Sequence, residues 1–183
     1  MENNTISIVI GSWGSYNECN ERALGSSWLD LSDYYDWDEI EEELTKEGFD
    51  LKGIDEELFI QDLEGIDDSS LNCDYMHPKR LFETLKESEI LDNKYKYETF
   101  EAFIECRSYS DFEDLVDRKG SRWDDDIYLY RGYDWEDFGR ERFEMSGYSL
   151  PDDLEYYIDF EEYGKQLSYY AQEYSNGIIE IYV

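Results

Sequence analysis

The residues of this sequence with the clearest functional pattern are carboxylates at helical spacing, which could form a charged binding surface. Residues 30–50 contain ten Asp or Glu and one Lys, and residues 134–162 contain eleven acids and two Arg. Both stretches favour helix, so acids three or four positions apart share a face, with Cβ atoms ~5–6 Å apart. Each such like-charged pair destabilises a helix by ~0.2–0.5 kcal/mol. A surface kept at that cost indicates binding to positively charged partners.

Residues that would support catalysis are scarce. The single histidine, His77, precedes Pro78 at a predicted helix start, where a capping or surface role is favoured over that of a general base. The sequence contains no P-loop, GxGxxG or GxSxG motif. An enzyme using an Asp/Glu pair stays an alternative, but it would need a pair with a raised pKa inside a pocket. We therefore expect a protein that is not an enzyme and carries no cofactor.

Metal and disulfide chemistry are also disfavoured. Asp36 and Asp38 could begin an EF-hand, but Ile40 and Glu41 stand where a third oxygen ligand and a glycine belong. The cysteines are odd in number and far apart, with no CxxC, which predicts reduced thiols: Cys19, Cys73 and Cys106. No apolar run suits a signal peptide or a membrane span, so we expect a cytoplasmic protein with no bound metal.

The charge balance narrows the class of partner. Forty-eight acids against sixteen Lys and Arg give a formal net charge of -32, yet 40% hydrophobic and 17% aromatic residues suffice for a core. This charge disfavours nucleic acids and anionic membranes as partners, and favours a protein with a basic groove. Duplex DNA carries one charge per ~1.7 Å, so 32 charges correspond to roughly 54 Å, or about sixteen base pairs. DNA mimicry is thus as strong a hypothesis as a solvated acidic surface that aids solubility.

The elements that position these acids follow an α+β pattern. We expect a strand at Thr5–Gly11, a loop to Gly25, a short strand at Trp28–Leu31, and a strand at Leu58–Leu63. Between the last two, Asp36 should cap a helix that begins at Trp37 and ends before Gly48. These elements form a first α+β unit over residues 1–65.

Helices and then strands follow. Residues 66–120 form a helical unit whose apolar stripes have core spacing and include Leu81, Phe100 and Phe112, with Pro78 in a first turn. Residues 121–183 form a second α+β unit: a strand at Ile127–Tyr130, a helix at Trp135–Met145, a helix after Pro151 and a terminal hairpin. Asn176-Gly177 predicts a type I′ turn in that hairpin. We therefore expect an elongated α+β molecule of three small units in series.

Two stretches go beyond composition. One runs from the Ile6–Ile10 strand through Tyr16-Asn17-Glu18 to Trp28-Leu29-Asp30-Leu31 and the acidic helix. The other runs from Leu150-Pro151 through Tyr157-Ile158-Asp159 and Tyr163-Gly164 to the terminal hairpin. Together these stretches, in this order, resemble the ArdA antirestriction proteins of mobile elements and phages. The middle of the chain is unmatched; Cys19–Arg22 resembles an insertion, and Asp124–Gly147 is longer than usual for the family.

The resemblance implies a function and roles for named residues. It implies a dimeric mimic of bent B-form DNA that occupies the DNA-binding groove of type I restriction-modification enzymes and protects incoming DNA. It makes interface or scaffold residues of the C-terminal motif: Leu150, Pro151, Leu154, Tyr157, Ile158, Asp159, Tyr163 and Gly164. An ordinary amphipathic helix packed on the hairpin would also account for these residues.

The acids of the two helical stretches are the candidate phosphate surrogates: Asp36, Asp38, Glu39, Glu42, Glu43, Asp152, Asp153, Glu155, Glu161 and Glu162. Each should contribute little by itself, because the charge is shared among many. Two alternatives stay open. The protein could be an acidic interaction module for basic proteins, or it could inhibit another DNA-binding defence enzyme such as a CRISPR nuclease.

Overall fold

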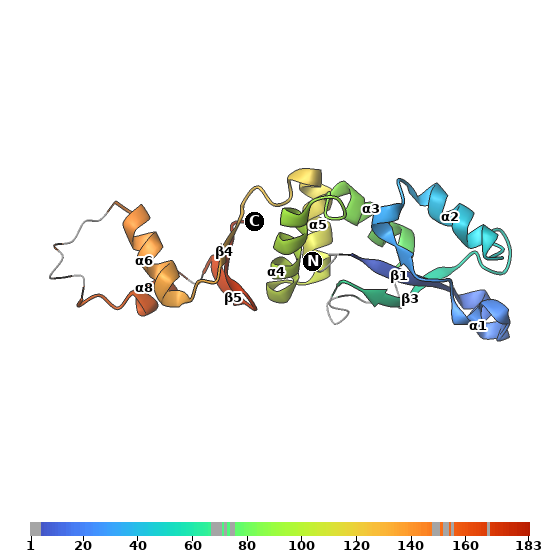
Figure 1. Cartoon of the computed structure of the whole chain (residues 1–183), viewed down its shortest axis with the longest axis horizontal. Helices are drawn as coiled ribbons and strands as arrows, with labels where there is room; N and C mark the ends of the chain where they lie inside the picture. The colour runs from blue at the N-terminus through green and yellow to red at the C-terminus, as the bar shows by residue number, and fades with distance from the viewer. Residues whose placement is uncertain are drawn as a thin grey trace. The chain divides into compact units, whose positions relative to one another are not determined.

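The chain folds into two compact units (Figure 1). The computed structural model describes residues 5–66, 71, 73, 76–147, 151, 154, 156–167 and 169–183. One unit comprises Met1–Ile104 and Ser108–Trp123, the other Glu105–Arg107 and Asp124–Val183. Each contains a three-stranded antiparallel sheet with helices, which is the α+β class that the sequence predicts. The further division of the first unit at residue 65 stays a prediction. Within the described ranges, no helix is long and apolar enough to cross a bilayer.

The first sheet has the strand order β2-β1-β3. Its strands are β1 (Ser7–Ser12), β2 (Leu29–Asp30) and β3 (Leu58–Glu64), close to the predicted ranges. β1 is central and pairs antiparallel with both neighbours, with a register shift between Val9 and Ile10 against β3. Its β-branched side chains fill the core, as a strand covered on both faces requires.

The segment after β1 is helical, and the prediction of a loop there was wrong. α1 (Trp13–Glu18) begins at Ser12, whose side chain accepts a hydrogen bond from the Ser15 backbone N–H, and a 3-10 turn follows at Glu21–Leu24. Gly14 lets α1 approach the segment around Ile54 closely, since a Cβ on residue 14 would lie 1.9 Å from the Ile54 carbonyl oxygen. The small and polar residues that indicated a loop are thus used for capping and close packing.

The acidic helix α2 (Trp37–Lys46) forms as predicted. The Asp36 side chain accepts a hydrogen bond from the Glu39 backbone N–H at 3.2 Å and caps the helix. Trp37, Ile40 and Leu44 are buried, so one face of α2 packs on the unit and the acids face solvent. The chain leaves the helix at Gly48, whose φ of 95° lies in the left-handed region.

Three helices complete this unit: α3 (Pro78–Glu87), α4 (Lys94–Cys106) and α5 (Tyr109–Lys119). Figure 1 shows them grouped beside the sheet. Their predicted apolar stripes meet in an aromatic core, in which the Phe112 ring contacts Phe100 at 4.7 Å and Trp123 at 5.1 Å between centroids, both edge to face.

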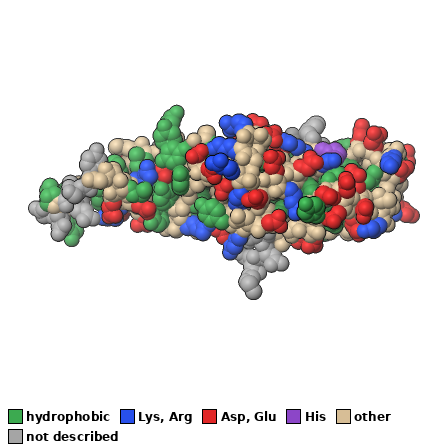
Figure 2. Space-filling model, turned by 90° about the horizontal axis from the view of Figure 1, so that it is seen from above, with side chains coloured by type: hydrophobic (Ala, Val, Ile, Leu, Met, Phe, Trp, Pro, Cys, Tyr) green, Lys and Arg blue, Asp and Glu red, His purple; other side chains and the backbone are tan. Residues whose placement is uncertain are grey.

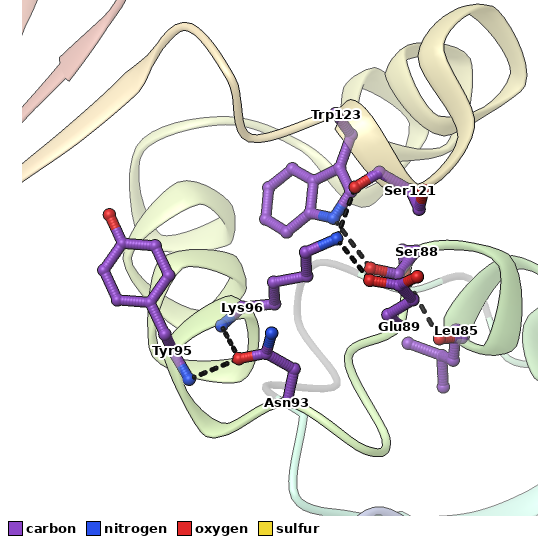
Figure 3. Close-up of polar contacts among 8 residues, drawn as sticks. All are labelled: Leu85, Ser88, Glu89, Asn93, Tyr95, Lys96, Ser121 and Trp123. Carbon is purple, nitrogen blue, oxygen red and sulfur yellow. Dashed lines mark hydrogen bonds and ion pairs between the residues drawn. The ribbon is translucent and has the colours of Figure 1, made fainter.

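A buried lysine ties this core together (Figure 3). Lys96, 9% exposed, donates to the Glu89 carboxylate at 2.8 Å and to the Ser121 backbone carbonyl. The Trp123 indole N–H donates to the Ser88 carbonyl at 3.1 Å. These bonds join the end of α3, the first turn of α4 and the segment after α5, so three separate parts of the chain are held at one point.

The second unit has the strand order β4-β6-β5. Its strands are β4 (Ile127–Arg131), β5 (Ala171–Tyr174) and β6 (Gly177–Ile181). Among the described residues, α6 (Trp135–Met145), with the predicted bounds, and α8 (Phe160–Gln166) accompany the sheet, and Leu154, after Pro151, is also helical. Phe138 of α6 packs against Ala171 and Ile178 of the sheet and against the Tyr130 ring.

The terminal hairpin forms, but its predicted turn type was wrong. Tyr174 pairs with Gly177, so the two-residue loop is Ser175-Asn176 and neither residue has the positive φ of a type I′ turn. Gly177 instead lies in β6, where a Cβ would come 2.1 Å from the Tyr130 carbonyl oxygen of β4. Close strand packing and a φ of 142° both favour glycine at this position, which is the first residue of β6 and not a turn residue.

Two glycines bring α6 and α8 together. A Cβ at Gly139 would lie 2.0 Å from the Phe160 carbonyl oxygen, and one at Gly164 would lie 2.3 Å from the Trp135 carbonyl oxygen. Around this crossing the Phe143 ring contacts Phe160 at 5.6 Å, edge to face. Because glycine has no side chain, the backbones of the two helices come into direct contact, and α6 and α8 lie next to each other in Figure 1.

Candidate acidic interface

Helix α2 concentrates carboxylates on its exposed side. Its ten residues include five acids (Asp38, Glu39, Glu41, Glu42 and Glu43). At 1.5 Å per residue the helix is ~15 Å long, which gives one acid per ~3 Å of axis. One strand of B-DNA places a phosphate every 3.4 Å. The linear charge density of α2 is therefore close to that of a DNA strand.

The predicted surrogates on α2 differ in what they contact. Asp36 caps the helix, and the Glu39 carboxylate accepts the Tyr35 backbone N–H at 2.7 Å. Glu43 pairs with Lys46 at 2.9 Å. Among the described residues, Asp38 and Glu42 form no ion pair, although Glu42 interacts electrostatically with Lys46, and both are exposed. These two carboxylates, one helical turn apart, are the most available for a partner.

A hollow of about 670 Å³ lies beside these two acids. Its lining comes from the exposed side of α2 and from the turn that follows it: Asp38, Glu41, Glu42, Thr45, Lys46, Phe49, Asp50, Leu51 and Lys52. On the face drawn in Figure 2, Asp and Glu side chains are spread widely, with Lys and Arg among them. The acids of α2 thus border a concave surface that a protruding group could enter.

Asp55 holds the turn behind this hollow. Its carboxylate accepts the Ser15 hydroxyl at 2.5 Å and the Asp50 backbone N–H at 2.8 Å. Burial alone would raise the pKa of Asp55, but hydrogen bonds from Ser12, Ser15 and Asp50 outweigh it and hold that pKa below its usual range. A buried, ionised carboxylate therefore fixes α1 and the hollow's rim to each other. It was missed in the sequence, where it lies in a run of other acids.

The surrogates predicted near the C-terminus are only partly visible. Asp152, Asp153 and Glu155 lie outside the described residues. Glu161 forms an ion pair with Lys165 one turn further along α8. Glu162 is exposed and, in the part of the chain that the structure describes, forms no ion pair of its own but interacts electrostatically with Lys165. The structure therefore groups Asp36 to Glu43 on one helix and Glu161 with Glu162 on another.

The motif residues divide into exposed and packed groups. Pro151, Leu154 and Tyr157 are exposed, the last with 85% of its surface accessible, while Ile158 is half-buried. In contrast, three members build the α6–α8 pair: Asp159 caps α8, the Tyr163 ring contacts Phe143 at 5.8 Å, and Gly164 lies at the helix crossing. Leu150 lies outside the described residues.

His77 acts as a helix cap. Its Nδ1 accepts the Lys79 backbone N–H at 3.2 Å at the start of α3, and its ring lies 6.1 Å from that of Trp37. Partial burial, followed by the nearby Lys79, lowers its pKa, which keeps the accepting neutral form.

A buried carboxylate in β6 was not predicted. Glu180, 3% exposed, accepts the Tyr130 hydroxyl at 2.8 Å and the Tyr182 hydroxyl at 3.0 Å, and Arg142 Nε lies 3.5 Å from it. Burial, followed by the bond to Glu180, raises the pKa of Tyr130, so its phenol stays protonated. A lone acid in an otherwise apolar strand was the available signal in the sequence.

Comparison with known proteins adds a family. Residues 8–180 match the family model described as antirestriction protein (ArdA). This range runs from β1 to β6 and so spans almost all of both sheets and the helices between them. No individual curated protein gives a significant match.

Proposed function

Because the chain belongs to the ArdA family of antirestriction proteins, we propose that it inhibits type I restriction-modification enzymes by occupying their DNA-binding groove. Incoming DNA is thereby protected. The observation that carries this proposal is the acidic face of α2, where five acids lie within ten residues at the axial density of one DNA strand.

The physical basis is competition for the same cations. A groove lined with Lys and Arg binds DNA largely by releasing counterions, and a rigid carboxylate array competes for those side chains. Asp38 and Glu42 enter such a groove without first breaking an ion pair, whereas Glu43 must give up Lys46. Association is fast and salt-sensitive, because the net charge of -32 steers the inhibitor toward a positive surface.

The test is inhibition of DNA binding by a purified type I methyltransferase, measured from 50 to 300 mM NaCl. We expect stoichiometric competition at low salt that weakens as salt rises. The double variant Asp38→Asn/Glu42→Gln should raise the inhibition constant about three- to tenfold and lower the salt dependence by roughly two counterions, at ~0.9 per phosphate contact.

The matched control is Glu43→Gln/Lys46→Gln, which removes an ion pair from the same helix without changing net charge. It should alter the inhibition constant by less than about twofold, since paired charges contribute little. Absence of competition at low salt would exclude groove occupation. If Asp38→Asn/Glu42→Gln also changed the inhibition constant by less than about twofold, these two carboxylates of α2 would be excluded as the contact.

The motif segment carries the second part of the proposal, a homodimer. Leu154 and Tyr157 expose apolar surface that a second copy would cover. Sedimentation velocity of the full chain measures this directly, and a monomer at micromolar concentration would refute it.

A further inference from the structure

The second unit has a cavity of about 390 Å³ on one face of its sheet. Tyr128 and Tyr130 of β4 and Glu180 of β6 line it, as do Arg142 and Met145 of α6, Asp126 and Tyr182. Tyr128 stands directly opposite Glu180 in the β4–β6 register, so the two residues share this face. The acidic face of α2 is on the other unit and takes no part in this cavity.

The floor of the cavity is an ordered polar network. Tyr130 and Tyr182 both donate their hydroxyl protons to Glu180, whose charge Arg142 balances. A phenol that donates to a carboxylate still has its oxygen lone pairs free to accept, and its ring becomes more electron-rich. Both phenols are therefore fixed in orientation at the cavity, and part of the acceptor capacity of Tyr130 is already used by Arg142.

The rim is aromatic and exposed. Tyr128 is 49% and Tyr182 41% accessible, and their rings meet edge to face at 6.1 Å. Tyr170 stacks on Tyr182 at 4.9 Å and contacts Tyr169 at 4.7 Å. Tyr128 and Tyr182, which line the cavity, thus present π-surfaces and hydroxyls together, a combination that binds cations when ring faces are accessible.

We propose that this tyrosine-walled cavity binds a cationic side chain, an arginine or lysine presented by a partner protein. Ring faces, phenol oxygens and the Asp126 carboxylate supply attraction to the cation, while Glu180 and Arg142 compensate each other beneath it. At this cavity a basic partner is favoured over a second copy, because an approaching copy brings a net charge of -32; the homodimer proposed above uses the separate apolar surface of Leu154 and Tyr157. The identity of the partner as a restriction enzyme rests on the proposed function; the cation site does not.

This site would differ in kind from the acidic helix. Contacts of α2 with a groove are long-range and screened by salt, whereas a cation over a desolvated ring depends on contact and shape. A single contact of this kind would fix the position of the inhibitor along the groove, which the long-range contacts of its carboxylates do not determine.

The experiment is an NMR titration of the full chain, carrying ring-labelled tyrosine, with N-acetyl-arginine amide in 300 mM NaCl. We expect saturable shifts on the Tyr128, Tyr130 and Tyr182 rings, with a dissociation constant on the order of 1–10 mM. The neutral isostere N-acetyl-citrulline amide should produce no such shifts. Tyr128→Leu and Tyr182→Leu should each weaken binding at least tenfold.

Tyr35→Leu is the control, because Tyr35 is exposed on the first unit and leaves net charge unchanged. It should not alter the titration. Equal shifts with citrulline, or shifts spread over all tyrosines and lost in 300 mM NaCl, would overturn the proposal. So would ring shifts that follow protein concentration alone together with a dimer that Tyr128→Leu dissociates, because a second copy would then cover the face. No restriction enzyme is present, so this failure and failure of the proposed inhibition are distinguishable.

Discussion

The buried charged groups described above are each held by an opposite charge or by several hydrogen bonds. Lys96 is nine-tenths buried, and its ammonium group is satisfied by one carboxylate and at least one backbone carbonyl (Figure 3). An ammonium group without such partners would carry a large desolvation penalty. Its bonds also satisfy the Ser121 carbonyl, which lies between α5 and the fully buried Trp123. The lysine is therefore a structural residue, despite belonging to a class that usually lies on the surface.

Replacement of Lys96 tests this role. We expect Lys96→Met to lower the free energy of unfolding by about 1–3 kcal/mol, because the Ser121 carbonyl loses its donor while Glu89 stays half-exposed to water. Urea unfolding followed by tryptophan fluorescence measures it, since Trp123 reports the same site. Lys94→Met, on the same turn of α4 with an exposed ion pair to Glu98, should change stability by less than about 0.5 kcal/mol. Similar losses for both variants would mean that burial of Lys96 is unimportant.

Among the elements, the α6–α8 pair shows that a glycine of the predicted motif, Gly164, serves to let two helices pack closely. Gly139 and Gly164 face each other where the two helix backbones meet, and neither has a positive φ, so sterics rather than backbone strain require glycine. The same crossing places Arg140 over the Phe160 ring at 4.4 Å. A motif residue that the sequence assigns to an interface or a scaffold thus lies in a helix contact, and its part in a dimer stays a prediction.

Gly164→Ala tests that contact. On an exposed helix the change would stabilise by roughly 1 kcal/mol, but here the new Cβ would lie 2.3 Å from the Trp135 carbonyl oxygen. We therefore expect a net loss of about 1–3 kcal/mol from overpacking, seen as a lower urea midpoint for the second unit. Gln166→Ala, exposed on the same helix, serves as the control and should be near neutral. A stabilised Gly164→Ala protein would show that the helices do not meet there.

The elements that the sequence predicts well are those with strong local signals. The Asp36 cap with the Trp37, Ile40 and Leu44 stripe predicts α2, and Trp135 to Met145 predicts α6 with its observed bounds. The predictions were wrong where contacts with backbone far away in the sequence determine the local structure. Gly14 and Gly177 indicate a loop and a turn locally, yet both fit beneath carbonyls of other segments, Ile54 and Tyr130. Among the candidate sites, spacing locates the α2 acids, but only the fold distinguishes Asp38 and Glu42 from the paired Glu43.

On the scale of the whole molecule, the same charge that favours a basic partner opposes folding. Forty-eight acids against sixteen Lys and Arg leave most carboxylates without a cation to neutralise them. Compact packing brings these charges closer than in the unfolded chain, so self-repulsion destabilises the folded state. The aromatic and aliphatic cores of the two units must offset that repulsion.

Salt should therefore act on stability and on inhibition with opposite signs. Raising NaCl from 10 to 300 mM shortens the Debye length from ~30 Å to less than 8 Å, which screens repulsion between exposed carboxylates. We expect the free energy of unfolding in urea, an uncharged denaturant, to rise by about 1–2 kcal/mol, the sum of several like-charged pairs. Inhibition of the methyltransferase should weaken over the same range. A solvated acidic surface with no basic partner predicts the first change without the second. Stability that does not rise with salt would mean that the carboxylates are already neutralised in the folded protein, and that a charge array like that of DNA is not displayed.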